Sequence, residues 1–210
     1  MFFIELIHNT ALLVALTAIY QITLSRNKKN QLTYTLLFGV LFGIAGVIGM
    51  ITPVQYGNGV IFDGRSIILF VVGMFGGPIS AMISAVIIGG FRVWLGGAGM
   101  YVGVTVITVA TLIGVAYYYY RKSVGGSLKA LPLLGAGLLV HGIMLLLFLC
   151  LPDGIGLQVD KELGPTIMLF YPIATMLVCL LFQDYEEKEV SRGELHRLAY
   201  YDSLTGLPNR

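Results

Sequence analysis

The sequence predicts an all-α integral membrane protein. We expect a compact, glycine-rich, polytopic helical bundle of six to seven membrane helices, followed by a cytoplasmic signalling helix. Of the 210 residues, 57% are hydrophobic and only 11% are charged, whereas about a quarter of the residues in a soluble domain are charged. Several apolar stretches approach the roughly 20 residues that cross a bilayer. The 27 glycines often recur at helical spacing, which lets membrane helices pack closely.

Five stretches are long and apolar enough, or nearly so, to form one membrane helix each. The first of them lacks a basic start and an A-x-A cleavage site, so we expect it to stay in the membrane instead of being removed as an export signal. The five stretches are residues 2–24, 32–51, 100–120, 130–151 and 166–182.

A sixth apolar run, residues 66–95, is too long for one upright helix. A Gly-Gly-Pro triplet at 76–78 interrupts it, and proline breaks a helix because it lacks an N–H group and clashes with the preceding turn. We therefore predict two shorter helices, at about 66–75 and 78–95. A full crossing and a re-entrant hairpin are the two alternatives for this pair, and in both the chain leaves and returns on one side.

Basic residues set the predicted orientation, because cytoplasmic loops of membrane proteins are rich in lysine and arginine. Ten of the thirteen basic residues fall on one side of the predicted spans, leaving Arg65, Arg92 and Lys161 on the other. We therefore expect the N-terminus outside and the C-terminal tail in the cytoplasm. The ten are Arg26, Lys28, Lys29, Arg121, Lys122, Lys129, Lys188, Arg192, Arg197 and Arg210.

Charge and cysteine content argue against several classes of partner. The net charge of +2 gives no support for a nucleic-acid partner. Cys150 and Cys179 both lie in apolar runs, which predicts small buried thiols and no disulfide framework. No second histidine or cysteine is placed to form a metal site with His141, which we expect to be a hydrogen-bonded interior residue. We expect no cofactor in this chain.

Charged residues at the membrane boundary suggest a ligand site. Asp63, Arg65 and Arg92 are costly to place there, and charges at such depth usually face a bundle interior. The predicted helix pair brings the two arginines to one level, where Asp63 can neutralise only one of them. Because guanidinium groups bind carboxylates bidentately, we expect a small anionic ligand. In the alternative, Asp63 pairs locally and Arg92 snorkels to the headgroups.

Three further residues are candidates for polar or aromatic contacts to that ligand. They are Trp94, Tyr101 and Thr105.

The run Asp63-Gly-Arg-Ser, then Phe75-Gly-Gly-Pro, then Phe91-Arg-Val-Trp-Leu-Gly-Gly resembles the LytS–YhcK five-transmembrane receptor module (5TMR-LYT). That family carries D-x-R, G-x-F-G-G-P and an arginine before L-G-G in this order. The resemblance covers about residues 32–184 and implies a bacterial sensor. Some members respond to small carboxylates such as pyruvate, which implies ligand contacts at Arg65 and Arg92. Relatives have a cysteine and a serine where this chain has Gly103 and Val106.

The C-terminal run Asp202-Ser-Leu-Thr-Gly-Leu-Pro-Asn-Arg210 resembles the opening of a GGDEF domain, the diguanylate cyclase fold. The resemblance implies that this chain is the sensor half of a cyclase that makes cyclic di-GMP. The metal-binding aspartate and the GG[DE]EF loop are absent from the 210 residues, so we expect this chain to have no cyclase activity. GTP and magnesium are expected only for a complete GGDEF domain.

The predicted organisation has four parts. Residues 1–31 form the first membrane helix and a cytoplasmic connection, and residues 32–183 form the sensor bundle. Residues 184–200 extend the last span as a signalling helix interrupted at Gly193, and residues 201–210 begin the GGDEF domain. Cyclases of this class bring two active sites together, which implies a homodimer through the C-terminal helix. The alternatives are a histidine-kinase sensor of cell-wall turnover and a substrate-binding transporter subunit.

Overall fold

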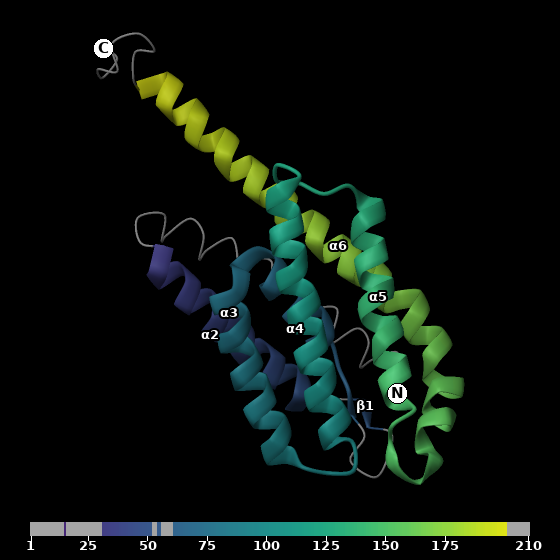
Figure 1. Cartoon of the computed structure of the whole chain (residues 1–210). Helices are drawn as coiled ribbons and strands as arrows, with labels where there is room; N and C mark the ends of the chain where they lie inside the picture. The colour runs from purple at the N-terminus through teal and green to yellow at the C-terminus, as the bar shows by residue number, and fades with distance from the viewer. Residues whose placement is uncertain (1–14, 16–30, 52–53, 56–60, 201–210) are drawn as a thin grey trace.

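The computed structural model describes residue 15 and residues 31–51, 54–55 and 61–200, and this part of the chain is almost entirely helical (Figure 1). Five of its helices are long and apolar enough to cross a membrane, so the all-α membrane prediction is confirmed. The predicted first span, residues 2–24, and residues 201–210 lie outside the described residues. The elements are α2 Gln31–Ile51, β1 Val54–Gln55, β2 Ile61–Phe62, α3 Arg65–Leu95, α4 Met100–Ser123, α5 Ala130–Phe148, the 3₁₀ turn η1 Pro152–Gly154 and α6 Ile155–Tyr200. The strands β1 and β2 form one short antiparallel pair.

The break inside α3 confirms the predicted helix pair. Gly77 has φ 73° and ψ −174°, a conformation that glycine adopts without steric cost. The first half of α3 packs on α4 through Gly73 and Gly114, where a Cβ on Gly73 would lie 2.7 Å from the Gly114 backbone. The turn itself lies beside Tyr118, near the last turn of α4. The pair therefore runs along α4 to the turn beside Tyr118 and back, so the chain leaves and returns at one end of the bundle, as predicted.

Small residues hold α2 against the second half of α3, as their spacing predicts. A Cβ on Gly39 would lie 2.9 Å from the Ser80 carbonyl oxygen. Ser80 donates to the Thr35 carbonyl at 2.8 Å, and Ser84 donates to the Gly39 carbonyl at 2.7 Å. The close approach thus allows hydroxyl groups on one helix to bond the backbone of the other, which is favourable in lipid.

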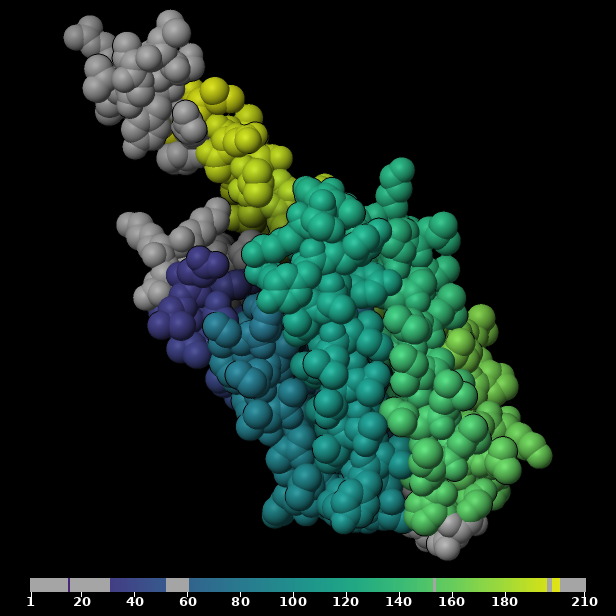
Figure 2. Space-filling view, viewed as in Figure 1, coloured from purple at the N-terminus to yellow at the C-terminus, as the bar shows by residue number. Residues whose placement is uncertain are grey.

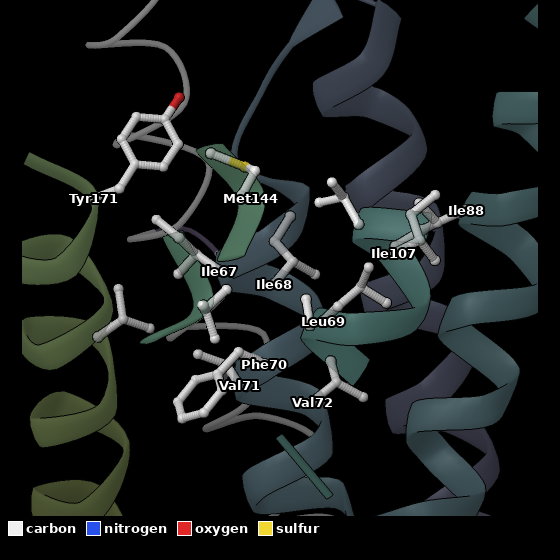
Figure 3. Close-up of a cluster of buried hydrophobic side chains, with 14 of the residues drawn as sticks. Ile67, Ile68, Leu69, Phe70, Val71, Val72, Ile88, Ile107, Met144 and Tyr171 are labelled. Atoms are coloured by element: carbon white, nitrogen blue, oxygen red, sulfur yellow. The ribbon is translucent and has the colours of Figure 1, made fainter. Parts of the chain in front are cut away.

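The first half of α3 is the centre of the bundle. Every residue from 65 to 75 is buried, and the buried cluster includes side chains of α4, α5 and α6 (Figure 3). A helix that is apolar on all sides is buried on all sides. This short segment therefore contacts the other helices and not lipid.

The last helix, α6, differs from the prediction at both of its expected boundaries. It begins at Ile155 instead of residue 166, and it continues through Gly193 to Tyr200 without a break. The start differs because the prediction followed hydropathy, whereas polar residues can form helix beyond the hydrocarbon. The helix continues through Gly193 because one glycine costs a helix only about 1 kcal/mol. With 46 residues, α6 is about 70 Å long at 1.5 Å per residue. It runs beside α5 and projects beyond the other helices (Figures 1 and 2).

The start of α2, the connection between α4 and α5, and the polar part of α6 lie at one end of the bundle. Gln31, Gly126 and Glu187 line the same surface hollow there. This placement agrees with the predicted clustering of basic connections on one side. We call this end the Arg121 end, and we call the opposite end, where α3 begins and ends, the Arg65 end.

At the Arg121 end, α6 is fastened to the connection between α4 and α5. The buried Gln183 side chain accepts a hydrogen bond from the Leu128 N–H at 2.7 Å and donates one to the Leu128 carbonyl at 3.0 Å. Arg121 pairs with Glu186, and its guanidinium carbon lies 4.6 Å from the centre of the Phe75 ring. The end of α4 and the loop after it therefore contact both the broken helix and the emerging part of α6.

Candidate functional site

Asp63 and Arg65 form the first part of a charged cluster at the Arg65 end. Asp63 precedes α3, and its Oδ1 accepts the backbone N–H of Arg65 at 2.9 Å. The same oxygen lies 3.5 Å from Arg65 Nε, and the Asp63 and Arg65 side chains are 0% and 8% exposed. The short D-x-R spacing thus lets one carboxylate oxygen hold both the backbone and the side chain of Arg65.

The rest of the Arg65 guanidinium has weak partners. It donates to the Ile61 carbonyl at 3.2 Å and to the Met50 sulfur at 3.1 Å. A thioether is a poor hydrogen-bond acceptor compared with a carboxylate. An anion that replaced the Met50 sulfur would therefore gain a stronger, charge-assisted bond with Arg65.

Arg92 lies at the same end, as predicted, but it is buried instead of snorkelling, with 1% exposure. Its Nη1 donates to the Gly96 carbonyl at 2.6 Å, within the turn where Gly96 and Gly97 have positive φ. A Cβ on Gly103 would lie 2.6 Å from Arg92 Nε, so the guanidinium lies directly on the α4 backbone. The absence of a side chain at position 103 makes room for this arginine.

Asp63 interacts electrostatically with both arginines. Burial raises the pKa of the Asp63 carboxyl, whereas the positive charges of Arg65 and Arg92 act in the opposite direction. Burial has the larger effect on this pKa, and the two nearby cations favour the ionised carboxylate. Its Oδ2 is buried and has no hydrogen-bond partner among the described residues. A buried carboxylate oxygen without a donor is unfavourable, so this atom marks the unsatisfied side of the cluster.

A small cavity lies against this cluster, with a volume of about 20 Å³. That is enough for one water molecule. Asp63 and Arg65 line it, whereas Arg92 lies behind Gly103 and does not. The other lining residues are Ile61, Phe62, Ser66, Gly99, Val102, Gly103, Val106, Met144, Phe148, Leu151, Ile167 and Tyr171.

Hydrogen bonds join the cavity wall to α5, and a ring contact continues to α6. His141 Nδ1 lies 2.8 Å from the Gly137 carbonyl, and its Nε2 lies 3.1 Å from the Ser66 hydroxyl. Because a carbonyl only accepts, Nδ1 carries the proton and Nε2 accepts from Ser66. The imidazole packs edge-on against Tyr171. His141 is thus a hydrogen-bonded interior residue, as predicted, and the described residues contain no metal-binding group of histidine, cysteine, aspartate and glutamate.

Comparison with protein families gives one match. A family model described as the 5TMR of 5TMR-LYT matches residues 17–185. The chain belongs to the 5TMR-LYT family. Searches of curated proteins and of solved structures found no match. Membership of this family, together with the apolar helices, makes the chain a multi-pass membrane protein that carries a sensory receptor module.

Within this 5TMR-LYT module, three predicted contact residues do not line the cavity. Trp94 and Tyr101 are 77% and 78% exposed, and Thr105 is exposed and donates to the Tyr101 carbonyl at 2.9 Å. They lie on outward faces of their helices, where lipid is the expected neighbour of a membrane bundle. Their sequence positions were close to Arg92, but helical periodicity turns them away from it.

Two polar residues that line the cavity, Ser66 and Tyr171, are not among the predicted contacts. Ser66 follows Arg65 directly, and Tyr171 comes from the middle of α6. The position of Ser66 was a usable signal, since it continues the D-x-R motif. Tyr171 lies in a long apolar run, and only the antiparallel packing of α5 and α6 brings it to the site. Figure 3 shows its ring beside Met144 at the edge of the buried cluster.

Proposed function

We propose that this chain is the receptor module of a bacterial inner-membrane sensor and that it binds a small carboxylate at the Arg65 end. The charge balance of the cluster carries this proposal. Arg65 and Arg92 are both buried, and Asp63 is the carboxylate that interacts electrostatically with both of them. Two cations and one anion leave one positive charge in excess. A buried charge without compensation is costly, and a bound monoanion would neutralise it.

Ligand binding requires the site to open. A cavity of about 20 Å³ holds one water molecule and not a three-carbon acid. Met50 and Met144 are the adaptable side chains here, because Met50 contacts Arg65 and Met144 lines the cavity. Methionine has three rotatable bonds and repacks readily. In this proposal, binding and rearrangement of the core are one event.

The rearrangement is passed to α6. The cavity is lined by residues of α3 and by Ile167 and Tyr171 of α6, and α6 continues without a break to Tyr200. The GGDEF-like residues 202–210 follow directly in the sequence. We propose that the ligand thereby regulates cyclic di-GMP synthesis by a GGDEF domain, with GTP and magnesium bound there and not in the bundle.

The orientation and the dimer belong to the same proposal. With basic connections at the Arg121 end facing the cytoplasm, the ligand site opens to the outside and the tail of α6 lies inside. Leu195 and Leu198 are 67% and 64% exposed on that tail. They offer an apolar edge for a second copy, and a homodimer would bring two GGDEF domains together.

Titration calorimetry on the purified chain in lipid nanodiscs tests the ligand site. We expect a short carboxylate such as pyruvate or lactate to bind the native chain. We expect Arg65→Ala to lose at least about 30-fold in affinity, since removal of one partner from a buried charge pair costs about 2 kcal/mol or more. Arg121→Ala is the matched control at the opposite end and should leave the affinity unchanged. Equal losses for the two variants would defeat the proposed site.

A fusion of this chain to a complete GGDEF domain after Arg210 tests the output. Membranes carrying the fusion should change their rate of cyclic di-GMP formation from GTP when the carboxylate is added. The Arg65→Ala fusion should not respond. Uptake of the labelled acid into vesicles, with no effect on the cyclase, would instead identify a transporter subunit.

A further inference from the structure

We propose that the site selects a 2-hydroxy acid, a small carboxylate with a hydroxyl on the carbon next to the carboxylate. This inference rests on the proposed carboxylate site and adds the chemical class of the ligand. It is carried by the two oxygens of Asp63, which have different surroundings.

The first step concerns hydrogen bonding at Asp63. Oδ1 is occupied by the N–H of Arg65, whereas Oδ2 is buried and has no partner among the described residues. An ionised carboxylate can only accept hydrogen bonds. A ligand that replaces the water molecule for which this cavity has room must therefore bring a donor to Oδ2. A hydroxyl or an ammonium group satisfies this requirement, whereas the keto oxygen of pyruvate and the methylene of propionate do not.

The second step concerns charge. Arg65 and Arg92 contribute two positive charges, and Asp63 contributes one negative charge. A hydroxy acid is a monoanion and brings the buried total to zero. An amino acid is a zwitterion and leaves one positive charge uncompensated, which is unfavourable in a buried site. Of the ligands that carry a donor, the structure thus favours the hydroxy acid.

The third step concerns placement. Asp63 and Arg65 are two residues apart and line the same cavity, so one short ligand can reach both. Its carboxylate would replace the Met50 sulfur at Arg65, and its hydroxyl would donate to Asp63 Oδ2. The phenol of Tyr171, also in the wall, is a further donor for the ligand carboxylate. We therefore expect Tyr171 to strengthen binding of every small carboxylate, and Asp63 to select those that carry a hydroxyl.

The experiment compares four acids of similar size by titration calorimetry in nanodiscs: lactate (each enantiomer), pyruvate, propionate and alanine. The titrations are run at pH 8, because burial raises the pKa of Asp63 and the carboxylate must be ionised. We expect one enantiomer of lactate to bind at least tenfold more tightly than each of the other acids. Pyruvate binding as tightly as lactate, or more tightly, overturns the inference but leaves the carboxylate site intact. No binding of any acid would defeat the proposed function as well.

The variant Asp63→Asn reverses the expected preference. Its amide oxygen would keep the hydrogen bond from the Arg65 N–H, so its NH₂ group would take the place of Oδ2. That position then donates, and pyruvate should bind more tightly than lactate. Tyr171→Phe is the matched control, which should weaken both acids equally and leave their ratio unchanged. Retention of the lactate preference in a folded Asp63→Asn protein would contradict the inference. If this variant does not fold, the wild-type ratio decides alone.

Discussion

Both ends of the bundle hold an arginine and a carboxylate, but in different surroundings. At the Arg65 end, the side chains of Arg65 and Asp63 are 8% and 0% exposed. At the Arg121 end, those of Arg121 and Glu186 are 18% and 24% exposed. The first pair shares its site with the buried Arg92, and Asp63 Oδ2 has no partner among the described residues. The second pair joins α4 to α6 at the rim.

The difference separates a binding site from a structural junction. Water and counter-ions can reach the Arg121 end, so an imbalance of charge there costs little. At the Arg65 end the same imbalance is expensive unless a ligand removes it. The two ends are connected by the buried first half of α3, since Arg65 begins it and Phe75, which contacts Arg121, lies near its end. If Arg65 moves when the ligand binds, we therefore expect α3 to transmit that movement to the junction between Arg121 and α6.

The largest fall in the free energy of unfolding is expected for Asp63→Asn in the absence of ligand. The substitution removes the carboxylate that interacts with two buried guanidinium groups, and loss of one partner in a buried ionic group costs about 3–5 kcal/mol. The free energy of unfolding, measured by SDS titration in mixed micelles, should fall by that amount. A carboxylate ligand should restore part of the loss. A fall no larger than that of Glu186→Gln would show that the two ends are equivalent.

A second large fall in the free energy of unfolding is expected at the Arg121 end, from substitution of the uncharged side chain of Gln183. Gln183→Leu removes both hydrogen bonds to Leu128 and leaves a buried N–H and carbonyl unsatisfied. Each such group costs about 1–3 kcal/mol, so we expect the free energy of unfolding to fall by at least about 2 kcal/mol.

Carboxylate affinity should stay within about twofold of the native value in Gln183→Leu, because position 183 is remote from the cavity. A fusion to a GGDEF domain should nevertheless lose its response to the ligand. A large loss of affinity would mean that the junction and the binding site are not separate.

Glu186→Gln makes the same chemical change as Asp63→Asn at the rim. The pair with Arg121 is partly exposed, and such pairs contribute up to about 1 kcal/mol. We expect the free energy of unfolding to fall by about that amount in low salt and by less in 1 M salt, since salt screens exposed pairs. The charge-swapped variant Arg121→Glu with Glu186→Arg should recover most of the loss. An effect that is insensitive to salt would contradict the assignment of this pair to the rim.

Most of the fold could be predicted from local patterns. Apolar length located the helices, and the Gly-Gly-Pro triplet at 76–78 located the break in α3. Small residues such as Gly39 marked a close helix contact. The start of α6 at Ile155 was missed because hydropathy reports which residues prefer lipid and not which residues are helical.

The site was predicted only in part. Asp63, Arg65 and Arg92 were found because charges are rare near membrane spans. Tyr171 and Ser66 were missed, and Trp94 was placed near the ligand although it is exposed. Which face a residue occupies depends on the rotation of each helix, and that rotation is set by packing with distant segments. The closeness of Trp94 to Arg92 in the sequence therefore does not show which face of the helix Trp94 occupies.

The smallest change in the free energy of unfolding is expected for Asp184→Asn. With Asp63→Asn and Glu186→Gln it forms a series of carboxylate-to-amide substitutions at increasingly exposed positions. Asp184 pairs with Lys188 at 2.7 Å, but the two side chains are 56% and 70% exposed. Pairs of this kind within a helix contribute about 0.3–0.5 kcal/mol, so the free energy of unfolding should change by no more than that. The series then falls from Asp63 through Glu186 to Asp184 as exposure rises from 0% to 24% to 56%. If Asp63→Asn instead ranked with Asp184→Asn, water would already reach the cluster, and the charge imbalance that argues for an anionic ligand would lose its force.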